Sequence, residues 1–417
     1  MSYVADLHIH SSYAMGTSPQ LTLENLATWA KIKGIDLLAT GDFTHPVWQQ
    51  DIQKKLADSA DYLFSYQNVS FVLGTEVNCV YQQTGRSHRV HLLLFAPSFD
   101  VVDKISRLLT KWGNLTEDGR PMLLISCREL TEGVMSIDER CIVMPAHAWT
   151  PWFSVYGSDG GFDSLEECFG DAAKAITAIE TGLSSDPGMN WQIKELDNKT
   201  IVSFSDAHSL PRLGRELTVF EGDLSYDGLR NALKTQGVDY TIEFFPEEGK
   251  YHYDGHRKCG VCQSPEQTLA ANNNLCCPKC GKRMTIGVDH RVRALSNKQV
   301  IPLLDKDGFY RHPTGPRPPY KRMVALDEII SQAIGVGIAT KKVTESHRKL
   351  IAALGSELSV LQAASVSDIT SVAGERIAEG IDLVRKGLID IKPGYDGVYG
   401  SIRIWPDDKK QTKLEGF

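Results

Sequence analysis

The sequence lacks long hydrophobic runs, an uninterrupted apolar segment near its start and any long-period repeat. No stretch of the 417 residues approaches the roughly 20 apolar residues that a membrane-spanning helix needs, so we expect no membrane partner. Asp6, His8 and His10 interrupt the first apolar run, and we therefore expect no signal peptide.

Cysteine is also scarce for a disulfide-stabilised protein. The nine cysteines are too few for a disulfide framework in a chain of this length. Four of them, Cys79, Cys127, Cys141 and Cys168, are scattered and are expected to be small buried residues. We therefore expect the protein to reside in the cytoplasm.

The formal charge of −7 is unevenly distributed along the chain. Residues 250–349 contain 18 Lys and Arg against 8 Asp and Glu, a balance of +10, whereas the remainder carries −17. A basic segment in an acidic protein is typical of a surface that faces a polyanion. A solvated surface without a partner is the alternative.

The chain is too long for one ordinary domain. Residues 1–245 alternate between strand-like and helix-like patterns, which predicts an α/β domain with a largely parallel sheet or barrel. Helical patterns include Leu21–Lys33 and Val101–Trp112, and the strand-like runs include Val4–Ile9, Ile35–Ala39, Val69–Leu73, Val90–Phe95, Cys141–Met144, Ala175–Ile179 and Thr200–Phe204.

The character of the chain changes at Phe245–Gly249. We predict three parts: the α/β domain at 1–245, a cysteine-rich basic module with a connector at 246–322, and a helical domain at 323–417. Arg311–Arg322 contains four prolines, which favours an extended connector.

Metal-ligating residue types recur where predicted strands end. Asp6-Leu7-His8-Ile9-His10 and Asp206-Ala207-His208 place acids and histidines at every second position, and therefore on one face of each strand. Ligands gather at the carboxyl ends of strands in α/β folds. Further candidates follow or open other strand runs: Asp42, His45, Glu76, His91, His147 and Glu180. Together they favour a divalent metal site, although each histidine alone could be a buried hydrogen-bonding residue.

Cys259-Gly-Val-Cys262 and Cys277-Pro-Lys-Cys280 form two C-x2-C pairs at the spacing of a structural zinc site. Cations surround the pairs, among them Lys282 and Arg283. A basic zinc module often contacts a phosphate backbone, but it can also brace two domains.

Two glycine turns between helical runs resemble helix-hairpin-helix elements. The first contains Gly335 and Gly337 and is followed by Lys341 and Lys342, and the second contains Gly374. Backbone N–H groups in such turns reach a phosphate without reading bases. A glycine turn that only joins packed helices is the alternative for each.

The first 245 residues resemble the polymerase-and-histidinol-phosphatase (PHP) family. The matching pieces are Asp-Leu-His-Ile-His-Ser, Gly-Thr-Glu, the His91 strand, Pro-Ala-His147 and Ser-Asp206-Ala-His208. The resemblance implies a distorted seven-stranded α/β barrel that binds two or three divalent ions, such as Zn, Mn or Mg.

The same resemblance implies how the ligands are shared. His8, His10, Glu76 and Asp206 would hold one ion, and Glu76 would bridge to a second ion held by His91 and His147. His208 with Asp42 or His45 would help to hold a third. One departure affects the third site, because the family often has an acid a few residues after the first His-x-His, where this chain has Ser11–Met15.

Over essentially its full length the chain resembles the endonuclease Q family, judged also from Pro145–Phe153, Ser205–Leu213 and Gly394–Gly400. This implies a DNA repair endonuclease that cuts 5′ of a deaminated base or an abasic site. Extraction of the base from the stack would use surfaces near the metals. The candidate contacts are Trp149, Trp152, Phe153, Tyr156, Ser158, Asp186 and Arg212, and ordinary packing is the alternative for each aromatic residue.

The expected mechanism is attack of metal-activated water on phosphorus. His8, His10, Asp206, His208 and His45 are the candidate catalytic residues, the last two for proton transfer. We expect one structural zinc, damaged DNA as the partner, a further repair or replication partner, a monomer and a nucleoid-associated location. The rival functions are a small-molecule phosphatase and a non-catalytic DNA-binding scaffold.

Overall fold

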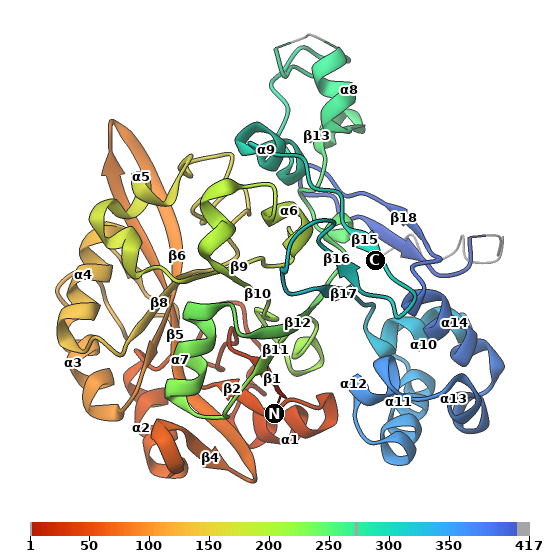
Figure 1. The fold of residues 1–417 in the computed structure, drawn as a ribbon, viewed down its shortest axis with the longest axis horizontal. Coiled ribbons are helices and arrows are strands. Elements are labelled where there is room, and N and C mark those ends of the chain that lie inside the picture. The colour runs from red at the N-terminus through yellow and green to blue at the C-terminus, as the bar shows by residue number, and fades with distance from the viewer. Residues whose placement is uncertain (1, 272–273, 407–417) are drawn as a thin grey trace.

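The computed structural model describes residues 2–271 and 274–406. A strand-rich body lies on one side of the molecule and a cluster of short helices on the other (Figure 1). The barrel strands are β1 (Ser2–Asp6), β2 (Leu37–Ala39), β5 (Val69–Gln83), β6 (Arg86–Ala96), β8 (Ile142–Pro145), β9 (Ala178–Glu180), β10 (Thr200–Val202), β11 (Leu217–Glu221) and β12 (Val238–Glu243).

The barrel strands pair in the order β12-β11-β1-β2-β5-β6-β8, with β9 and β10 as a separate parallel pair. The pairs β1-β2 and β2-β5 are parallel, whereas β1-β11, β11-β12, β5-β6 and β6-β8 are antiparallel. The sheet is therefore mixed rather than largely parallel. One cause is the two-residue turn at Thr84 and Gly85, whose φ values of 50° and 77° suit a tight hairpin.

The predicted strand runs each overlap one of these strands, some by only two or three residues. The two helical patterns correspond to α1 (Leu23–Lys33) and α3 (Phe99–Leu109). Thr22 caps α1 by accepting a hydrogen bond from the Asn25 N–H. The other α-helices and strands of this region are α2 (Pro46–Lys55), β3 (Ala57–Asp58), β4 (Phe64–Tyr66), β7 (Met122–Leu123), α4 (Cys127–Ile137), α5 (Leu165–Phe169), α6 (Pro187–Asn190) and α7 (Tyr226–Thr235).

The connector adds strands to the edge of the barrel sheet. β17 (Tyr320–Arg322) pairs in parallel with β12, and β16 (Tyr310–Arg311) and β15 (Leu303–Leu304) continue the sheet beyond it. The cysteine-rich segment before the connector contains β13 (Asp254–His256), β14 (Val261–Gln263), α8 (Pro265–Ala270) and α9 (Val288–Leu295).

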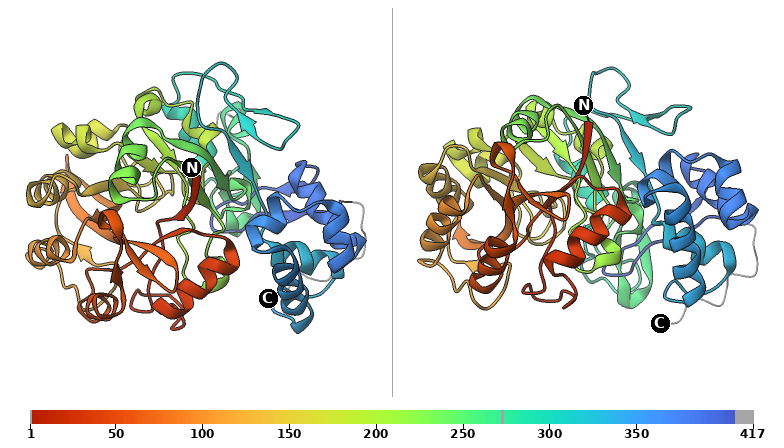
Figure 2. Two further views of the ribbon diagram at one scale, coloured as in Figure 1. Left: turned by 60° about the horizontal axis from the view of Figure 1, so that its bottom comes forward. Right: turned by 90° about the horizontal axis from the view of Figure 1, so that it is seen from below.

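The C-terminal region is helical, as predicted, and has its own hydrophobic core. Ile329, Leu350 and Ile381 are among the residues of this second core, which is separate from the core of the barrel. Figure 2 shows these helices to one side of the barrel in both views. They are α10 (Leu326–Ile334), α11 (Lys341–Leu354), α12 (Glu357–Gln362), α13 (Val366–Ala373) and α14 (Glu375–Arg385), followed by the hairpin β18 (Asp390–Lys392) and β19 (Ser401–Arg403). Among the helices of the described residues, none is long and apolar enough to cross a membrane.

A buried ion pair joins the helices to the barrel. The ammonium of Lys33, on α1, lies 2.8 Å from Glu357 Oε2 on α12, and His347 Nε2 lies 2.9 Å from the same oxygen. Burial raises the pKa of Glu357, but the charges of Lys33 and His347 outweigh it and bring that pKa to about 2. Glu357 therefore stays ionised in the folded protein.

Glu357→Gln is expected to destabilise the protein by about 3–5 kcal/mol near neutral pH, because Lys33 would remain buried without its counter-charge. A lowered folded-state pKa contributes stability above the unfolded pKa of about 4.3, and this contribution is lost as the pH falls towards 2. Chemical unfolding should therefore show a difference in the free energy of unfolding between the wild type and Glu357→Gln that is largest above about pH 5 and disappears at acid pH. If this difference stays the same across the pH range, ionised Glu357 does not stabilise the fold through its pair with Lys33.

Candidate metal centre

The two histidine-containing segments that are far apart in the sequence meet at one end of the barrel. Ile9 and Ala207 form a parallel bridge, and the His10 N–H donates to the carbonyl of Ala207 (3.3 Å). Alternate residues of adjacent extended segments face the same way. His8, His10 and Asp206 thus converge, which confirms the sequence prediction that these segments come together.

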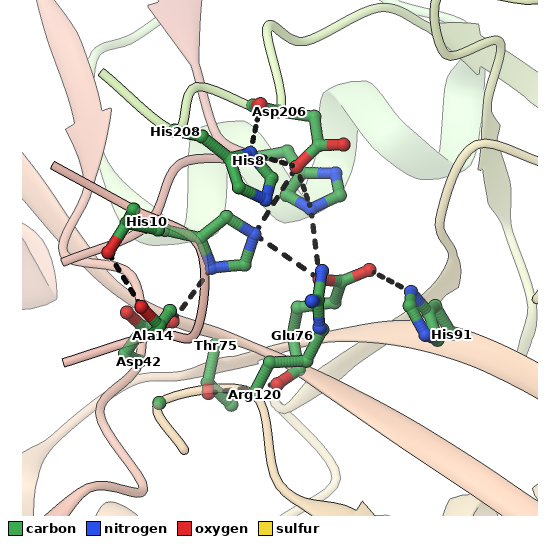
Figure 3. A network of polar contacts seen from close by, with 12 residues as sticks. His8, His10, Ala14, Asp42, Thr75, Glu76, His91, Arg120, Asp206 and His208 are labelled. Atoms are coloured by element: carbon green, nitrogen blue, oxygen red, sulfur yellow. Dashed lines mark hydrogen bonds and ion pairs between the residues drawn. The ribbon is translucent and has the colours of Figure 1, made fainter. Parts of the chain in front are cut away.

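A first group of potential ligand atoms surrounds one point. His8, His10, Glu76 and Asp206 each offer a ligand atom, and these atoms lie within 4.8 Å of one another. His10 Nε2 is 3.3 Å from Glu76 Oε2 and 3.2 Å from Asp206 Oδ1, and His8 Nε2 is 3.5 Å from both oxygens. Figure 3 shows the four side chains pointing at one another.

Three atoms of this group are buried without a hydrogen-bond partner: His8 Nε2, His10 Nε2 and Asp206 Oδ1. Unpaired buried polar atoms are costly, so their convergence calls for a cation. Two imidazoles and two carboxylates at these distances are a donor set that suits a divalent transition metal. The residues present therefore fit a metal ion.

A second group shares Glu76 with the first. Glu76 Oε1 lies 2.6 Å from His91 Nδ1 and 3.1 Å from His147 Nε2, and these two nitrogens are 3.2 Å apart. The two oxygens of Glu76 thus face two different groups, with Oε2 turned to His8 and His10. This is the arrangement expected of a carboxylate that bridges two ions.

Metal binding requires ionised carboxylates and neutral imidazoles. Burial lowers the pKa of His8, His10 and His147, but the neighbouring carboxylates outweigh it and hold the pKa of all three above the usual range, so these imidazoles would release a proton when a cation binds. Burial raises the pKa of Glu76 and of Asp206, but the neighbouring histidines outweigh it and hold the pKa of both carboxyls below the usual range. Burial lowers the pKa of His91 to about 4, so this imidazole is neutral near pH 7.

Two further buried carboxylates lie behind the ligand histidines. Glu180 accepts a hydrogen bond from His8 Nδ1 (2.9 Å) and another from the His147 N–H (2.6 Å). Asp42 accepts one from His10 Nδ1 (3.0 Å) through Oδ1, while its Oδ2 accepts from the N–H and the hydroxyl of Ser11. Such partners fix the orientation of the imidazole and its tautomer. Asp42 was predicted as a metal ligand, but both of its oxygens are engaged here, so it orients His10 instead.

The residues expected at a third ion lie apart from one another. His45 stacks on Tyr13 with ring centroids 4.5 Å apart, and His208 packs edge-on against His10 at 4.7 Å. His208 Nδ1 is hydrogen-bonded to the carbonyl of Asp206 (2.9 Å), and its side chain is 36% exposed. Among the described residues, neither histidine belongs to a group of three or more potential ligands.

Three residues of the centre adopt a backbone conformation that is uncommon for L-residues. Asp42, His147 and Asp206 have φ values of 48°, 29° and 46°. Each costs conformational energy, which the surrounding hydrogen bonds offset. The sequence holds no glycine at these positions because the side chain is needed.

Sequence reasoning missed Arg120. Its Nη1 lies 3.3 Å from Glu76 Oε2, at the rim of the first group (Figure 3). Arg120 belongs to a loop between α3 and β7, and no motif in the sequence distinguishes it from other arginines. Only the fold brings it to the metal centre.

The aromatic residues after His147 divide into two sets. Trp149 and Tyr156 are fully buried, stack on each other and donate hydrogen bonds to Asn190 and Glu195, so packing explains both. Trp152 is 37% exposed, and Phe153 lies 5.1 Å from the ring of His91. Phe153 therefore lies beside the centre, whereas Trp152 packs edge-on against Tyr251 with ring centroids 5.1 Å apart.

The predicted polar contacts to DNA are mostly engaged within the protein. Asp186 is buried, caps α6 and binds Arg322 at 2.5 Å, so it has a structural role in place of the predicted base contact. Ser158 donates to the carbonyl of Ile286 (3.2 Å). Arg212 pairs with Glu328 at 2.7 Å, with a side chain that is 41% exposed.

The cysteine module gathers three of the four predicted cysteines. Cys259, Cys277 and Cys280 lie together with His256, each offering a ligand atom within 4.8 Å of the others. Cys262 was predicted as the fourth ligand, but it lies opposite Gly255 in the β13-β14 hairpin and is exposed. Neighbouring strand residues face opposite ways. Val261, the partner of His256, packs against Cys277, so Cys262 points to the other face.

The remaining predicted DNA contacts lie on the surface. Lys282 and Arg283 are exposed beside Cys280. Gly335 ends α10 and Gly374 separates α13 from α14, both with positive φ and open space around the α-carbon. Gly337, Lys341 and Lys342 are exposed as well.

Comparison with known sequences shows relatives over different lengths of the chain. Residues 325–388 match a family described as the MJ0043 C-terminal domain. The uncharacterized protein MJ0043 of Methanocaldococcus jannaschii is 36% identical over 268 residues, which cover 62% of this chain and 32% of that relative. The chain thus spans about a third of that protein. The uncharacterized protein YqxK of Bacillus subtilis is 29% identical over 96% of this chain and 98% of its own length.

Two solved structures resemble the whole chain. One is the crystal structure of the lesion-specific endonuclease PfuEndoQ from Pyrococcus furiosus, with 33% identity and a TM-score of 0.84 over 100% of this chain and 98% of that one. The other is endonuclease Q in complex with a 27-mer duplex substrate that has an abasic lesion at the active site. It also has 33% identity and a TM-score of 0.84, over 100% of this chain and 99% of that one.

Proposed function

The chain belongs to the endonuclease Q family, and from this membership we propose that it is a DNA repair endonuclease. Its substrate is duplex DNA with a deaminated base (uracil, hypoxanthine or xanthine) or an abasic site. The enzyme hydrolyses the phosphodiester on the 5′ side of the lesion and leaves 3′-hydroxyl and 5′-phosphate ends.

The observation that supports a metal-dependent reaction is the position of Glu76 between two ligand groups. His8, His10, Glu76 and Asp206 would hold one divalent ion, and Glu76, His91 and His147 a second. Bound there, such ions lower the pKa of water and stabilise negative charge on the phosphate oxygens. Zinc, manganese and magnesium are the candidates.

Two histidines near the metal centre, His208 and His45, are the candidates for the proton transfers. His208 is part-exposed, and its Nδ1 is held by the carbonyl of Asp206. Its Nε2 is therefore the atom that takes a proton from the attacking water or gives one to the 3′-oxygen that leaves. His45 lies under Tyr13 and is less accessible, with 7% of its surface exposed.

The remaining surfaces supply DNA contacts in this proposal. Phe153 offers stacking area beside His91 for an extracted base, with the part-exposed Trp152 next to it in the chain, and deaminated pairs are cheaper to open than normal ones. The exposed glycine turns at Gly335 and Gly374 offer backbone N–H groups to phosphates. We keep the division into 1–245, 246–322 and 323–417 as the domain organisation, although residues 407–417 lie outside the described residues.

The test compares labelled duplexes that contain uracil, hypoxanthine, xanthine or an abasic site with an undamaged duplex. Each is incubated with the purified enzyme and Mg²⁺, Mn²⁺ or Zn²⁺, alongside a chromogenic phosphate monoester. We expect a single nick 5′ of the lesion and no cut in the undamaged strand. Hydrolysis of the monoester alone would replace the proposal with a small-molecule phosphatase.

A further inference from the structure

Arg120 is carried to the metal centre by a loop that packs against the ligand residues. Gly119, just before it, approaches Asp42 so closely that an added Cβ would lie 2.6 Å from the carboxylate. The Gly119 N–H also donates to the carbonyl of Tyr13 (3.0 Å). The loop is therefore fixed against the carboxylate that orients His10.

Asp118 fixes the same loop from its other side. Its Oδ1 accepts hydrogen bonds from the Met15 N–H (2.9 Å) and from the Arg120 N–H (3.1 Å). This carboxylate joins the loop to the segment that follows β1. The position of the Arg120 backbone is thus determined by contacts on both sides.

The guanidinium of Arg120 lies between the buried ligands and the solvent. Its Nη1 is 3.3 Å from Glu76 Oε2, and its side chain is 23% exposed whereas that of Glu76 is 0% exposed. Among the described residues, no other lysine or arginine forms an ion pair with the carboxylate of Glu76 or Asp206. Arg215 donates to the carbonyls of Ser205 and Asp206 but is more deeply buried, so Arg120 is the cation on the solvent side of the Glu76 carboxylate.

Neutralising the charge of Glu76 does not explain why Arg120 lies beside it. Glu76 already faces four imidazoles, those of His8, His10, His91 and His147. A carboxylate that is shared by two divalent ions needs no further counter-charge. Each ion would also repel the guanidinium, whose side chain is 23% exposed on the solvent side.

A phosphodiester, in contrast, gains negative charge on its non-bridging oxygens as the water attacks. A guanidinium offers a planar fork of N–H donors that matches two such oxygens. In the described part of the chain the residues expected at a third ion, His208 with Asp42 or His45, do not form a group of three or more potential ligands. Arg120 is placed to supply positive charge at the phosphate in addition to the ions that the two ligand groups would hold.

We propose that Arg120 is a catalytic residue that turns from Glu76 to a non-bridging oxygen of the scissile phosphate and stabilises the charge that develops there. The inference rests on the proposed function, because it requires a phosphodiester at the centre. It adds a cationic side chain to the ligands as part of the catalytic machinery.

The test uses the full-length, metal-loaded protein with Arg120→Ala, Arg120→Lys and the control Arg128→Ala. Arg128 is an exposed arginine whose ion-pair partner is Glu132 on its own helix. Single-turnover cleavage of an abasic-site duplex is measured with and without added guanidinium chloride at constant ionic strength, together with the metal content of each protein. Hydrolysis of bis(4-nitrophenyl) phosphate is followed in parallel as a small phosphodiester.

Arg120→Ala is expected to lower the cleavage rate constant by about 10²–10³-fold at unchanged metal content, with partial restoration by guanidinium. Arg120→Lys should stay well below the wild type, and Arg128→Ala should equal it. A wild-type rate for Arg120→Ala, or a loss that follows metal loss and is not restored, would overturn the inference. If the wild type leaves the duplex intact but hydrolyses the small diester, the DNA substrate is wrong while the Arg120 comparison on the diester still decides this inference.

Discussion

Replacing Asp206 by Asn, or His8 by Ala, is expected to abolish nicking of a lesion-containing duplex while the fold is retained. Asp206→Asn keeps the shape of the side chain but removes one of the two carboxylates that face His8 and His10. The first group would then lack the charge that balances a divalent ion. On the purified variants, nicking assays measure the loss of activity, metal analysis measures the loss of bound ions, and circular dichroism shows whether the fold is retained.

Glu180→Gln is the graded control for these substitutions. Glu180 does not belong to either ligand group and acts through its hydrogen bonds to His8 and to the His147 N–H. Loss of such a partner costs about 10- to 100-fold in metal affinity or activity. Glu180→Gln should therefore need more metal for activity but remain active, whereas Asp206→Asn should not recover at any metal concentration. Full activity of metal-loaded Asp206→Asn would refute the assignment of the centre.

Cys277→Ser is expected to release one zinc ion and unfold the module around β13 and β14, while Cys262→Ser should leave both unchanged. Cys277 is in the group with His256, Cys259 and Cys280, and Cys262 is outside it. Binding of a structural zinc contributes about 10–16 kcal/mol in small zinc domains, so loss of one thiolate has a large effect. Zinc content and protease resistance of the segment report the result.

His256→Ala completes this comparison. If His256 is the fourth ligand, its removal should weaken zinc retention during dialysis against a chelator, as Cys277→Ser does. The reverse result, with Cys262→Ser losing zinc and His256→Ala keeping it, would show that the zinc-bound protein has a different register in the β13-β14 hairpin from the one in this structure. The sequence prediction of four cysteine ligands would then hold.

Much of the metal centre was predictable because its ligand types are placed by local rules. Alternation along an extended segment puts His8 and His10 on one side, and strand ends in an α/β fold lie at a common edge. Glu76, His91 and His147 each follow or open an apolar strand run. These features are properties of short segments, and a sequence displays them directly.

The roles of individual side chains were less predictable. Asp42 and Glu180 have the same chemistry as the ligand carboxylates, and only their distances show that they stand behind the histidines. Trp149 and Tyr156 have the composition of a stacking surface, yet they are buried in the barrel. Burial depends on what the rest of the chain places over a residue, and a local pattern does not contain that information.

By itself the sequence determined the α/β class of the first part, the helical character of the last part, the two regions that can bind metals and the resemblance to a DNA repair family. Tertiary structure alone decided that His256 lies in the cluster and Cys262 outside it, that the barrel sheet is mixed, and that Arg120 reaches Glu76. The physical reason is that ligand types and periodicity are local properties of the chain. Which side chain completes a cluster depends on strand register and on loops from distant segments.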